Sequence, residues 1–282
     1  MAETVAERRR RITADLESAG VPSAAYDAAA LVAYVLGCAP GQLALHARET
    51  LTPAAARRLA SLAARRAARE PLQLVLGTAP FHDLSLRVTP GVFIPRLETE
   101  GLARAALDAV AATEAPVIVD FCAGAGPLAV FLAARRSDAR VIAVEVDRDA
   151  CDDIRFNAAR YGAGVEVVTA DIRDPSLGKR LPTADLIVSN PPYIPASAVA
   201  DLPPEVRVWE NVRTQDGGRD GLDFYAVLGR LAAEGLKAGG FLAVEIGEEQ
   251  AAAVISILAS LGTATVGRDL AGRDRYVAVR KV

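Results

Sequence analysis

The strongest constraint on the fold is an alternation of apolar, strand-like runs with helix-like segments from about residue 115 onward. The strand-like runs are residues 116–121, 140–146, 165–171, 184–190, 240–246, 263–269 and 275–281. Helical patterns separate the first five runs, and this spacing predicts parallel strands joined by crossover helices. Only residues 270–274 join the last two runs, which is too short for a crossover helix, so the final strand must run antiparallel to its predecessor.

The segments that precede this region have other patterns. Residues 1–72 show helical periodicity with capping signals, such as Thr52 at a helix start and Gly37 at a helix end. Residues 73–95 contain short strand-like pieces interrupted by glycines and prolines, which predicts a hairpin. We therefore predict an N-terminal helical bundle domain (1–72), a β-hairpin linker (73–95) and an α/β domain (96–282).

The predicted α/β domain is a Rossmann-like sheet of seven strands in which the last strand is antiparallel. This topology is typical of class I methyltransferases that use S-adenosylmethionine (SAM). Open α/β sheets bind ligands in the crevice outside the carboxyl ends of their strands. The residues that end each strand are therefore the candidates for a binding site.

Composition limits the classes of partner. The net charge is −3 and no basic, aromatic-rich stretch is present, so we expect no direct nucleic-acid contact. Three well-separated cysteines and only two histidines argue against a metal site or a disulfide framework and fit a reducing cytoplasm. No apolar run of about 18 residues predicts a membrane span, and the N-terminus does not read as a signal peptide. Five arginines between residues 57 and 69 read as a solvated helix face, with contact to an acidic partner as the alternative.

Acidic residues end three of the predicted strands. Asp120 ends the first, and the glycine-containing loop CAGAG (122–126) follows it, where the backbone can approach a ligand closely. Glu145 ends the second strand and can accept hydrogen bonds from both hydroxyls of a ribose. Asp171 ends the third and can accept from an exocyclic adenine amine. Together they predict an adenosyl pocket; the alternative is that these acids only cap the helices that follow.

Two cofactors compete for such a pocket, NAD and SAM. Pro127 starts the helix after the glycine loop and removes one N–H group that a dinucleotide pyrophosphate would use. The sulfonium of SAM is positive and gains nothing from a helix N-terminus. The sequence therefore favours SAM over NAD.

The fourth strand ends in a rigid stretch, LIVSNPPYIP at residues 186–195. Pro191 and Pro192 fix their φ angles at about −65° and remove two backbone hydrogen-bond donors. Asn190 precedes this pair and Tyr193 follows it. A tight turn that closes a strand is the simplest explanation, unless the adenosyl pocket lies beside it.

With that pocket upstream, NPPY resembles the [DNS]PP[YFW] motif of amino- and amide-directed methyltransferases. The resemblance extends over nearly the whole chain, because six segments are similar in order and spacing to the release-factor glutamine N5-methyltransferases. These segments are residues 69–77, 91–100, 185–195, 216–225, 245–250 and 269–277. That family methylates the glutamine amide of the Gly-Gly-Gln loop in peptide-chain release factors. NPPY alone would also allow methylation of DNA adenine, rRNA or tRNA; IPRLETE (94–100) and the helical front domain narrow the choice.

This resemblance implies a chemistry that the motif suits. A carboxamide nitrogen is a poor nucleophile because its lone pair is delocalised into the carbonyl. Asn190 Oδ1 and the backbone carbonyl of Pro191 can accept its two N–H groups and aim the lone pair at the methyl group, while Tyr193 can pack on the amide plane. Such orientation supplies up to about 7–11 kcal/mol in ideal cases and requires no general base.

The pattern and the resemblance together imply a cytoplasmic, SAM-dependent protein-(glutamine-N5) methyltransferase that acts on a release factor, with S-adenosylhomocysteine as product. The implied cofactor-binding residues are Asp120, Phe121, Cys122, Ala123, Gly124, Ala125, Gly126, Glu145, Val146, Asp171, Ile172 and Asn190. The implied catalytic residues are Asn190, Pro191, Pro192 and Tyr193. Further candidates are Arg96, Thr99 and Glu100, and no metal ligand is implied.

The chain also departs from the family pattern. A loop that is commonly Gly-Thr-Gly-Ser-Gly is CAGAG, in which Cys122 reads as a small loop residue and not as a nucleophile. The usual aromatic-Glu-Pro has Asn211 in place of proline, and Ile172 stands where an aromatic residue often lies. The alternatives are therefore a related enzyme that methylates another amide or amine, and a SAM-binding module without catalysis.

Overall fold

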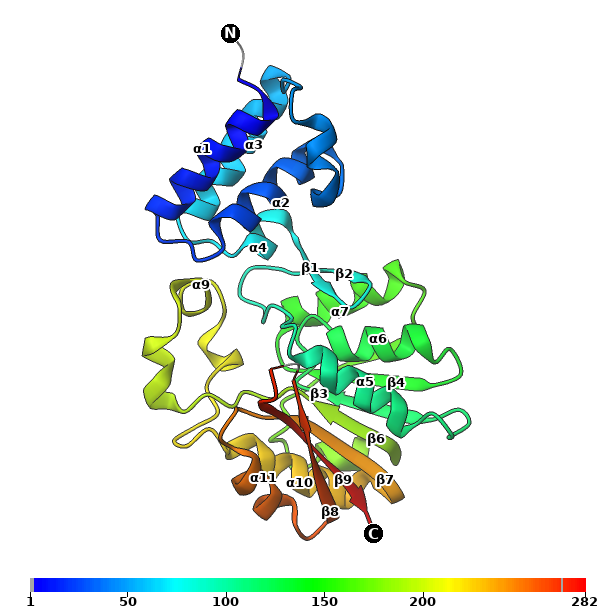
Figure 1. Ribbon diagram of the computed structural model, residues 1–282. Helices are drawn as coiled ribbons and strands as arrows, with labels where there is room; N and C mark the ends of the chain where they lie inside the picture. The colour runs from blue at the N-terminus through cyan, green and yellow to red at the C-terminus, as the bar shows by residue number, and fades with distance from the viewer. Residues whose placement is uncertain (1–2, 270) are drawn as a thin grey trace. The chain divides into compact units, whose positions relative to one another are not determined.

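The computed structural model describes residues 3–269 and 271–282, which divide into two compact units (Figure 1). One unit comprises Met1–Thr78 with Pro203–Trp209, and the other comprises Ala79–Leu202 with Glu210–Val282. The first unit thus takes in a short segment from far along the chain, which sequence periodicity does not indicate.

The first unit is helical, as the sequence predicts. Its elements are α1 (Val5–Ser18), α2 (Ala24–Leu36), the 3-10 helix η1 (Pro40–His46), α3 (Pro53–Ala67), α4 (Leu72–Leu76) and α9 (Pro204–Arg207). The predicted caps are present: the Thr52 side chain accepts from Ala55 N, and Gly37 ends α2 in the left-handed conformation. Leucines from three helices, Leu16, Leu31 and Leu59, are at most 1% exposed and form the core of the unit.

Arg66 on α3 and Arg69, two residues after the helix, belong to an internal ion-pair network. Arg66 is 3% exposed and donates from Nε to Asp27 Oδ2 of α2 at 2.6 Å. It also donates to Glu205 Oε1 of α9 at 3.0 Å, and Arg69 binds both oxygens of Glu205 at 2.6 and 2.7 Å. Arg66 and Arg69 bind acids of the same unit. Both interpretations of the arginines, a solvated helix face and a contact with an external acidic partner, are therefore wrong for these two residues.

The predicted linker begins differently from the expectation. Residues 72–76 form the short helix α4, because Pro71 precedes it and Gly77 ends it with a φ of 75°. The hairpin itself is β1 (Thr78–Phe81) and β2 (Leu84–Arg87), which pair in a sheet of two strands.

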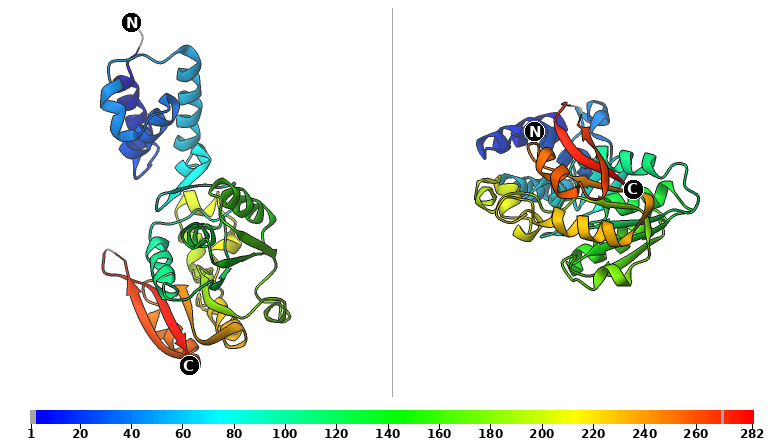
Figure 2. Two further views of the ribbon diagram at one scale, coloured as in Figure 1. Left: turned by 90° about the vertical axis from the view of Figure 1, so that its right-hand side faces the viewer. Right: turned by 90° about the horizontal axis from the view of Figure 1, so that it is seen from below.

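The second unit is built on the predicted sheet of seven strands, in the order β5-β4-β3-β6-β7-β9-β8. The strands are β3 (Val117–Phe121), β4 (Arg140–Glu145), β5 (Val165–Thr169), β6 (Ala184–Ser189), β7 (Leu236–Glu245), β8 (Gly262–Arg268) and β9 (Asp274–Lys281). β9 is antiparallel to both β7 and β8, at the edge drawn in orange and red in Figure 2. The predicted fold class is thereby confirmed.

Helices cover both faces of this sheet, so the unit has three layers (Figure 1). One face packs on α5 (Thr99–Ala109), α6 (Pro127–Arg135) and α7 (Arg148–Arg160); the other packs on α8 (Leu177–Arg180), α10 (Asp223–Gly235) and α11 (Ala251–Leu258). Successive residues alternate between the two cores, as in Ile118 and Val119 of β3. The 3-10 helices η2 (Ala196–Asp201) and η3 (Val212–Thr214) lie in the long connection from β6 to α10.

The chain order reverses direction at β3, which pairs with β4 on one side and with β6 on the other. Such a switch point leaves a crevice at the carboxyl ends of the strands, because the connections leave in opposite directions. Among the described residues, no single helix is long and apolar enough to cross a membrane, although α2 and η1 together, bent by 70°, meet the length and composition requirement. The described residues contain no group of three or more His, Cys, Asp or Glu side chains that could hold a metal.

Candidate functional site

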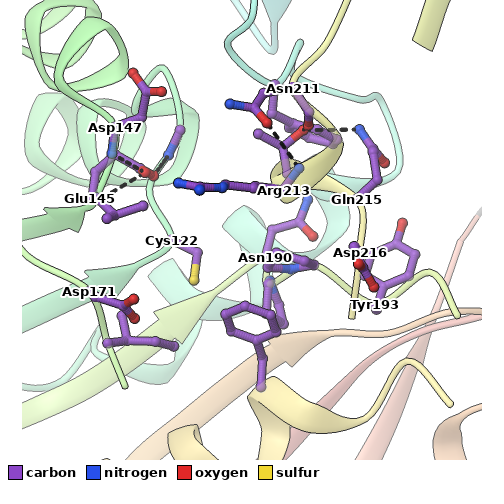
Figure 3. Close-up of a pocket in the computed structure, with 18 of the residues that line it drawn as sticks. Cys122, Glu145, Asp147, Asp171, Asn190, Tyr193, Asn211, Arg213, Gln215 and Asp216 are labelled. Atoms are coloured by element: carbon purple, nitrogen blue, oxygen red, sulfur yellow. Dashed lines mark hydrogen bonds between the residues drawn. The ribbon is translucent and has the colours of Figure 1, made fainter. Parts of the chain in front are cut away.

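A pocket of about 550 Å³ lies at this switch point (Figure 3). Its walls come from the loops that follow β3, β4, β5 and β6, from the connection 211–218 and from the start of α10. The sequence-predicted residues that line it are Cys122, Gly124, Glu145, Val146, Asp171, Ile172, Asn190, Pro191, Pro192 and Tyr193. Seven of the twelve predicted cofactor-binding residues thus share one cavity with the NPPY segment.

Glu145 is held by the backbone of two loops. Its Oε2 accepts from Gly124 N at 2.8 Å, and its Oε1 accepts from Val146 N and Asp147 N at 2.8 and 3.0 Å. Burial raises the pKa of this carboxyl, and the three backbone hydrogen bonds oppose that shift. The helix cap of α7 is Asp147 instead, which accepts from Asp149 N and Ala150 N. Glu145 therefore does not cap α7, and its oxygens retain acceptor capacity for a ligand.

Asp120 does not line the pocket. It is 0% exposed, and its Oδ2 accepts from Ala129 N in the first turn of α6 at 3.0 Å. Burial raises its pKa well above the ordinary value. Asp120 lies beneath the glycine loop and bonds the first turn of the helix that follows. Its contact is therefore the one expected from the alternative, in which the acid caps a helix and does not bind a ligand.

The glycine loop divides between the pocket and the interior. Cys122 and Gly124 line the cavity, whereas Phe121, Ala123, Ala125 and Gly126 do not. Gly126 has a φ of 82°, and a Cβ there would lie 3.1 Å from Ile154 of α7, so the glycine serves helix packing. Burial raises the pKa of the Cys122 thiol well above its usual value, which keeps it protonated and unsuited to act as a nucleophile.

Asp171 is paired at the edge of the pocket. Arg173 donates from Nη2 to its Oδ2 at 2.7 Å, and this contact lowers the pKa of the carboxyl. Ile172 lines the same wall and is 3% exposed. An ionised, acceptor-only carboxylate at this position matches the predicted contact with an amine.

Asn190 and Tyr193, on either side of the two prolines, each form a hydrogen bond with a buried side chain outside the motif. Asn190 donates from Nδ2 to Thr99 Oγ1 at 3.1 Å. The Tyr193 hydroxyl donates to Glu245 Oε1 at 3.3 Å, and burial raises the pKa of that phenol. The phenol oxygen is therefore tied to the interior.

The three residues predicted from IPRLETE have different positions. Thr99 is buried and bonds Asn190, whereas Glu100 Oε1 accepts from His82 N in the β1–β2 turn at 2.7 Å. Arg96 pairs with the carboxylate of Glu210. Neither Arg96 nor Glu100 lines the pocket, but Arg96 anchors the start of the connection 210–218, most of which does.

The connection 211–218 contributes pocket residues that sequence reasoning missed. Asn211, Arg213 and Gln215 line the cavity, and Figure 3 shows the Arg213 side chain extending across it toward Glu145. Gln215 Nε2 also donates to Glu210 Oε2 at 2.7 Å. The signal available in the sequence was Asn211, which stands where the family pattern in the sequence analysis has proline.

A second missed group supports the backbone of Tyr193. Gln250 Nε2 donates to Tyr193 O at 3.0 Å. Gly221 has a φ of 78°, and a Cβ there would lie 2.2 Å from the same carbonyl oxygen. Gly217 N donates to Ile194 O at 2.9 Å. The glycines of DGGRDG therefore allow this segment to pack directly on the NPPY backbone.

We expect Gly221→Ala to destabilise the protein by about 1–3 kcal/mol, because the new Cβ meets a backbone oxygen that cannot move freely. Urea denaturation would measure this change. Gly235→Ala is the matched control, because a Cβ there meets no atom within 4 Å and its φ is not positive. Equal stability of the two variants would contradict the proposed close contact.

Comparisons with known proteins follow the same division of the chain. Residues 7–77 match a family described as the PrmC N-terminal domain, and residues 83–202 match the methyltransferase small domain. The chain is 41% identical to the release factor glutamine methyltransferase of Corynebacterium glutamicum, with 99% of each chain covered. It is 42% identical to the protein of that name in Mycolicibacterium smegmatis, covering 96% of this chain and 95% of the relative.

A solved structure supports the fold. The Thermus thermophilus 16S rRNA N2 G1207 methyltransferase RsmC superposes with a TM-score of 0.53 at 18% identity, covering 73% of this chain and 50% of that chain. The sheet, its switch-point pocket and these likenesses define a Rossmann-like class I methyltransferase. With about 40% identity over nearly its whole length, the chain belongs to the release factor glutamine methyltransferase family.

Proposed function

We propose that this protein transfers a methyl group from SAM to the side-chain amide nitrogen of glutamine in the Gly-Gly-Gln loop of a peptide-chain release factor. The observation that supports the proposal most is the shared cavity: Asn190 and Pro191 line the same pocket as Glu145 and Gly124. The residues that would bind an amide and the residues that would bind an adenosyl group thus line one pocket in a chain of this family.

The pocket fits SAM by size and by chemistry. Its volume of about 550 Å³ lies within the ordinary range for cofactor sites, roughly 300–1,000 Å³. Glu145 would accept from the ribose, Asp171 from the adenine amine, and the backbone at Gly124, with a φ of 54°, would allow close approach. When bound, SAM supplies an electrophilic methyl group on a positive sulfonium. RsmC was solved in complex with AdoMet and guanosine.

The residues of the acceptor site would orient the glutamine amide. Asn190 Oδ1 would accept one N–H group and the carbonyl of Pro191 the other, and the rigid Pro191–Pro192 backbone would hold the two oxygens in place. Tyr193 would pack against the amide plane. Orientation of this kind contributes up to about 7–11 kcal/mol in the best cases, and the nitrogen can lose its proton after transfer.

The proposed function also includes the protein substrate, the cellular compartment and a role for each part of the chain. The release factor would be the protein substrate, in the cytoplasm, without direct contact to nucleic acid or membrane. The helical domain (1–72) would contribute to substrate recognition, the linker (73–95) would join it to the rest, and residues 96–282 would carry methyl transfer. Large exposed apolar side chains on the helical unit support a recognition role, among them Tyr26 and Leu45 at 65% and 79% exposed.

Mass spectrometry tests the proposed substrate directly. A release factor incubated with the protein and SAM should gain the mass of one methylene group on the peptide that contains Gly-Gly-Gln. The same release factor with that glutamine changed to alanine is the control. Binding of SAM without any gain in mass would refute this substrate and favour a related enzyme that acts on another amide or amine, which the polar wall at Asn211 and Gln215 also fits.

We expect Glu145→Ala to weaken SAM binding, because the hydrogen bond that the remaining acceptor site of this carboxylate would take from the ribose would be lost. A hydrogen bond to a charged group contributes about 1.5–3 kcal/mol, so the Kd should rise at least tenfold. Isothermal calorimetry would measure the Kd, with Glu166→Ala as the control, since Glu166 pairs with Arg140 at the surface. An unchanged Kd would remove Glu145 from the cofactor site.

A further inference from the structure

Arg213 is a pocket residue whose charged group has no bonded partner in the protein. It lines the cavity, and Figure 3 shows its side chain extending across the cavity toward Glu145. Within residues 3–269 and 271–282, its guanidinium makes no hydrogen bond or ion pair with another residue; only its backbone N–H bonds a side chain, that of Asn211. An arginine that crosses a cofactor pocket in this way is a candidate to bind a ligand.

The backbone around Arg213 is fixed from two sides. Asn211 N donates to Gly91 O at 3.0 Å, and Ile194 N donates to Gln215 O at 2.9 Å. Asn211 Oδ1 accepts from Arg213 N at 3.1 Å and caps η3. Asn211 stands where the family pattern has proline, whose side chain has no oxygen to form this cap. The Arg213 side chain is therefore presented to the cavity by a well-anchored backbone.

Acidic residues outnumber basic ones on the pocket wall. The acids that line it are Glu145, Asp147, Asp171, Asp216 and Asp223, whereas its basic residues are two arginines. The side chain of Arg173 already makes three hydrogen bonds with the carboxylate of Asp171. Among the lining residues that the structure describes, Arg213 is thus the cation that remains available to an anion.

The charges of SAM require such a cation. SAM has two positive groups, the sulfonium and the ammonium, and one negative group, the carboxylate of its methionine half. The acids of the pocket suit the positive groups, but they would repel the carboxylate unless a cation pairs with it. Backbone N–H groups of the glycine loop are other candidates. The N–H group of Gly124, which lines the pocket, already donates to Glu145 Oε2 at 2.8 Å.

We propose that Arg213 is a cofactor-binding residue that pairs with the carboxylate of the methionine half of SAM. A guanidinium can bind a carboxylate through two parallel N–H···O bonds, which contribute selectivity as well as affinity. The inference rests on the proposed use of SAM. It goes further because it assigns a residue to a part of SAM that the acids Glu145 and Asp171 cannot bind.

A carboxylate on the acceptor is the other anion that Arg213 could bind, because Asn211 and Gln215 of the same connection also line the pocket. The direction of the side chain favours the cofactor. In Figure 3 it points toward Glu145, the proposed ribose acceptor, and away from Tyr193 of the acceptor segment. A cofactor role predicts an effect on SAM binding when no acceptor is present.

Calorimetry with two ligands tests the pairing. We expect Arg213→Ala to raise the Kd of SAM about 5- to 20-fold, because a charged hydrogen-bonded pair is lost at an exposed position where water weakens it. Decarboxylated SAM, which lacks only the carboxylate, should lose no affinity in this variant. The ratio of the Kd of decarboxylated SAM to that of SAM should therefore fall. A ratio that does not fall would overturn the proposal.

Two further variants serve as controls. Arg213→Lys keeps the charge but loses the forked pair of donors, so its Kd for SAM should lie between those of wild type and Arg213→Ala. Arg219→Ala removes the same charge from an exposed position of the same connection that does not line the pocket. It should keep the wild-type Kd for both ligands. A rise with Arg219→Ala as large as with Arg213→Ala would show a general effect of charge and contradict a specific pair.

Steady-state kinetics distinguishes the cofactor from the acceptor. At saturating SAM, Arg213→Ala should keep the kcat and the KM for the release factor of the wild type, because the guanidinium would touch neither the methyl group nor the amide. The KM for SAM should rise. A raised KM for the release factor, together with an unchanged Kd for SAM, would place Arg213 on the acceptor side and refute the proposal.

Failure of this inference and failure of the proposed function give different results. The calorimetry needs no acceptor, so the fall in the Kd ratio would support the role of Arg213 even if no release factor were methylated. If the wild type binds SAM and methylates a release factor but the ratio is unchanged in Arg213→Ala, only the inference fails. If the wild type does not bind SAM, both fail.

Discussion

Asn190→Ala should reduce kcat for methylation about 10²- to 10³-fold, the scale observed when one preorganised hydrogen-bonding group is removed from an active site. The substitution removes the proposed acceptor, Oδ1, and leaves the carbonyl of Pro191 as the remaining contact for the substrate amide. Asn190 is also a predicted cofactor-binding residue. If its main role is to orient the acceptor amide, the substitution should change SAM binding much less than kcat. Single-turnover kinetics with a release factor and calorimetry with SAM measure the two quantities.

Asn190→Asp and Glu249→Ala sharpen this experiment. Aspartate keeps an oxygen that can accept from the substrate but loses the NH2 group that bonds Thr99, so its rate should lie between wild type and alanine. Glu249 is exposed at the same edge of the sheet, and its removal should leave the rate unchanged. A rate for Asn190→Ala within about threefold of wild type, less than 1 kcal/mol, would exclude a direct role in orientation.

The fold could be predicted because its signals are local. Runs of apolar residues place every strand of the large sheet, although β7 begins at Leu236, four residues before the predicted run. The short join at 270–274 was enough to fix the direction of β9. Residues 73–76 belong to α4 and not to a hairpin as predicted, because a short, mostly apolar run suits a strand or a helix equally.

The three acids at strand ends show where sequence patterns stop being informative. Asp120, Glu145 and Asp171 look equivalent in the sequence, but they differ in burial and in partner. Asp120 is enclosed between neighbouring strands and bonds the first turn of α6, whereas Glu145 bonds loop backbone at the pocket. Asp171 pairs with Arg173 two residues later. The environment of each acid depends on the direction of its side chain and on the conformation of the loop. The spacing of residues in the sequence predicts neither.

The groups behind the site could not be derived from spacing either, because they join distant segments. Asn190 meets Thr99 across 91 residues, and Arg96 meets Glu210 across 114. Glu245 reads as an ordinary polar residue at the end of β7, and only its burial and its contact with Tyr193 reveal a connection to the acceptor segment. The motif indicates which groups touch a substrate, while the fold decides what orients them.

Arg66→Ala should be the most destabilising single change in the helical unit, at about 3–5 kcal/mol. Arg66 and Asp27 are 3% and 2% exposed, and their side chains meet at 2.6 Å. Removal of the guanidinium leaves the Asp27 carboxylate buried without its cation, and it also removes one of the two arginines that bind Glu205 of α9. Urea denaturation, followed by the circular dichroism of the helices, would measure the loss.

The controls separate burial from charge. Arg57→Ala removes the same charge from an exposed position on the same helix and should change stability by no more than about 0.5 kcal/mol. Replacing both partners, Asp27→Leu with Arg66→Met, should recover much of the loss, because no unpaired charge remains. If Arg66→Ala were as stable as Arg57→Ala, the buried pair would not hold the unit together. If the unit does unfold, SAM binding should persist while methylation of a release factor is lost, because all the residues that line the pocket belong to the other unit.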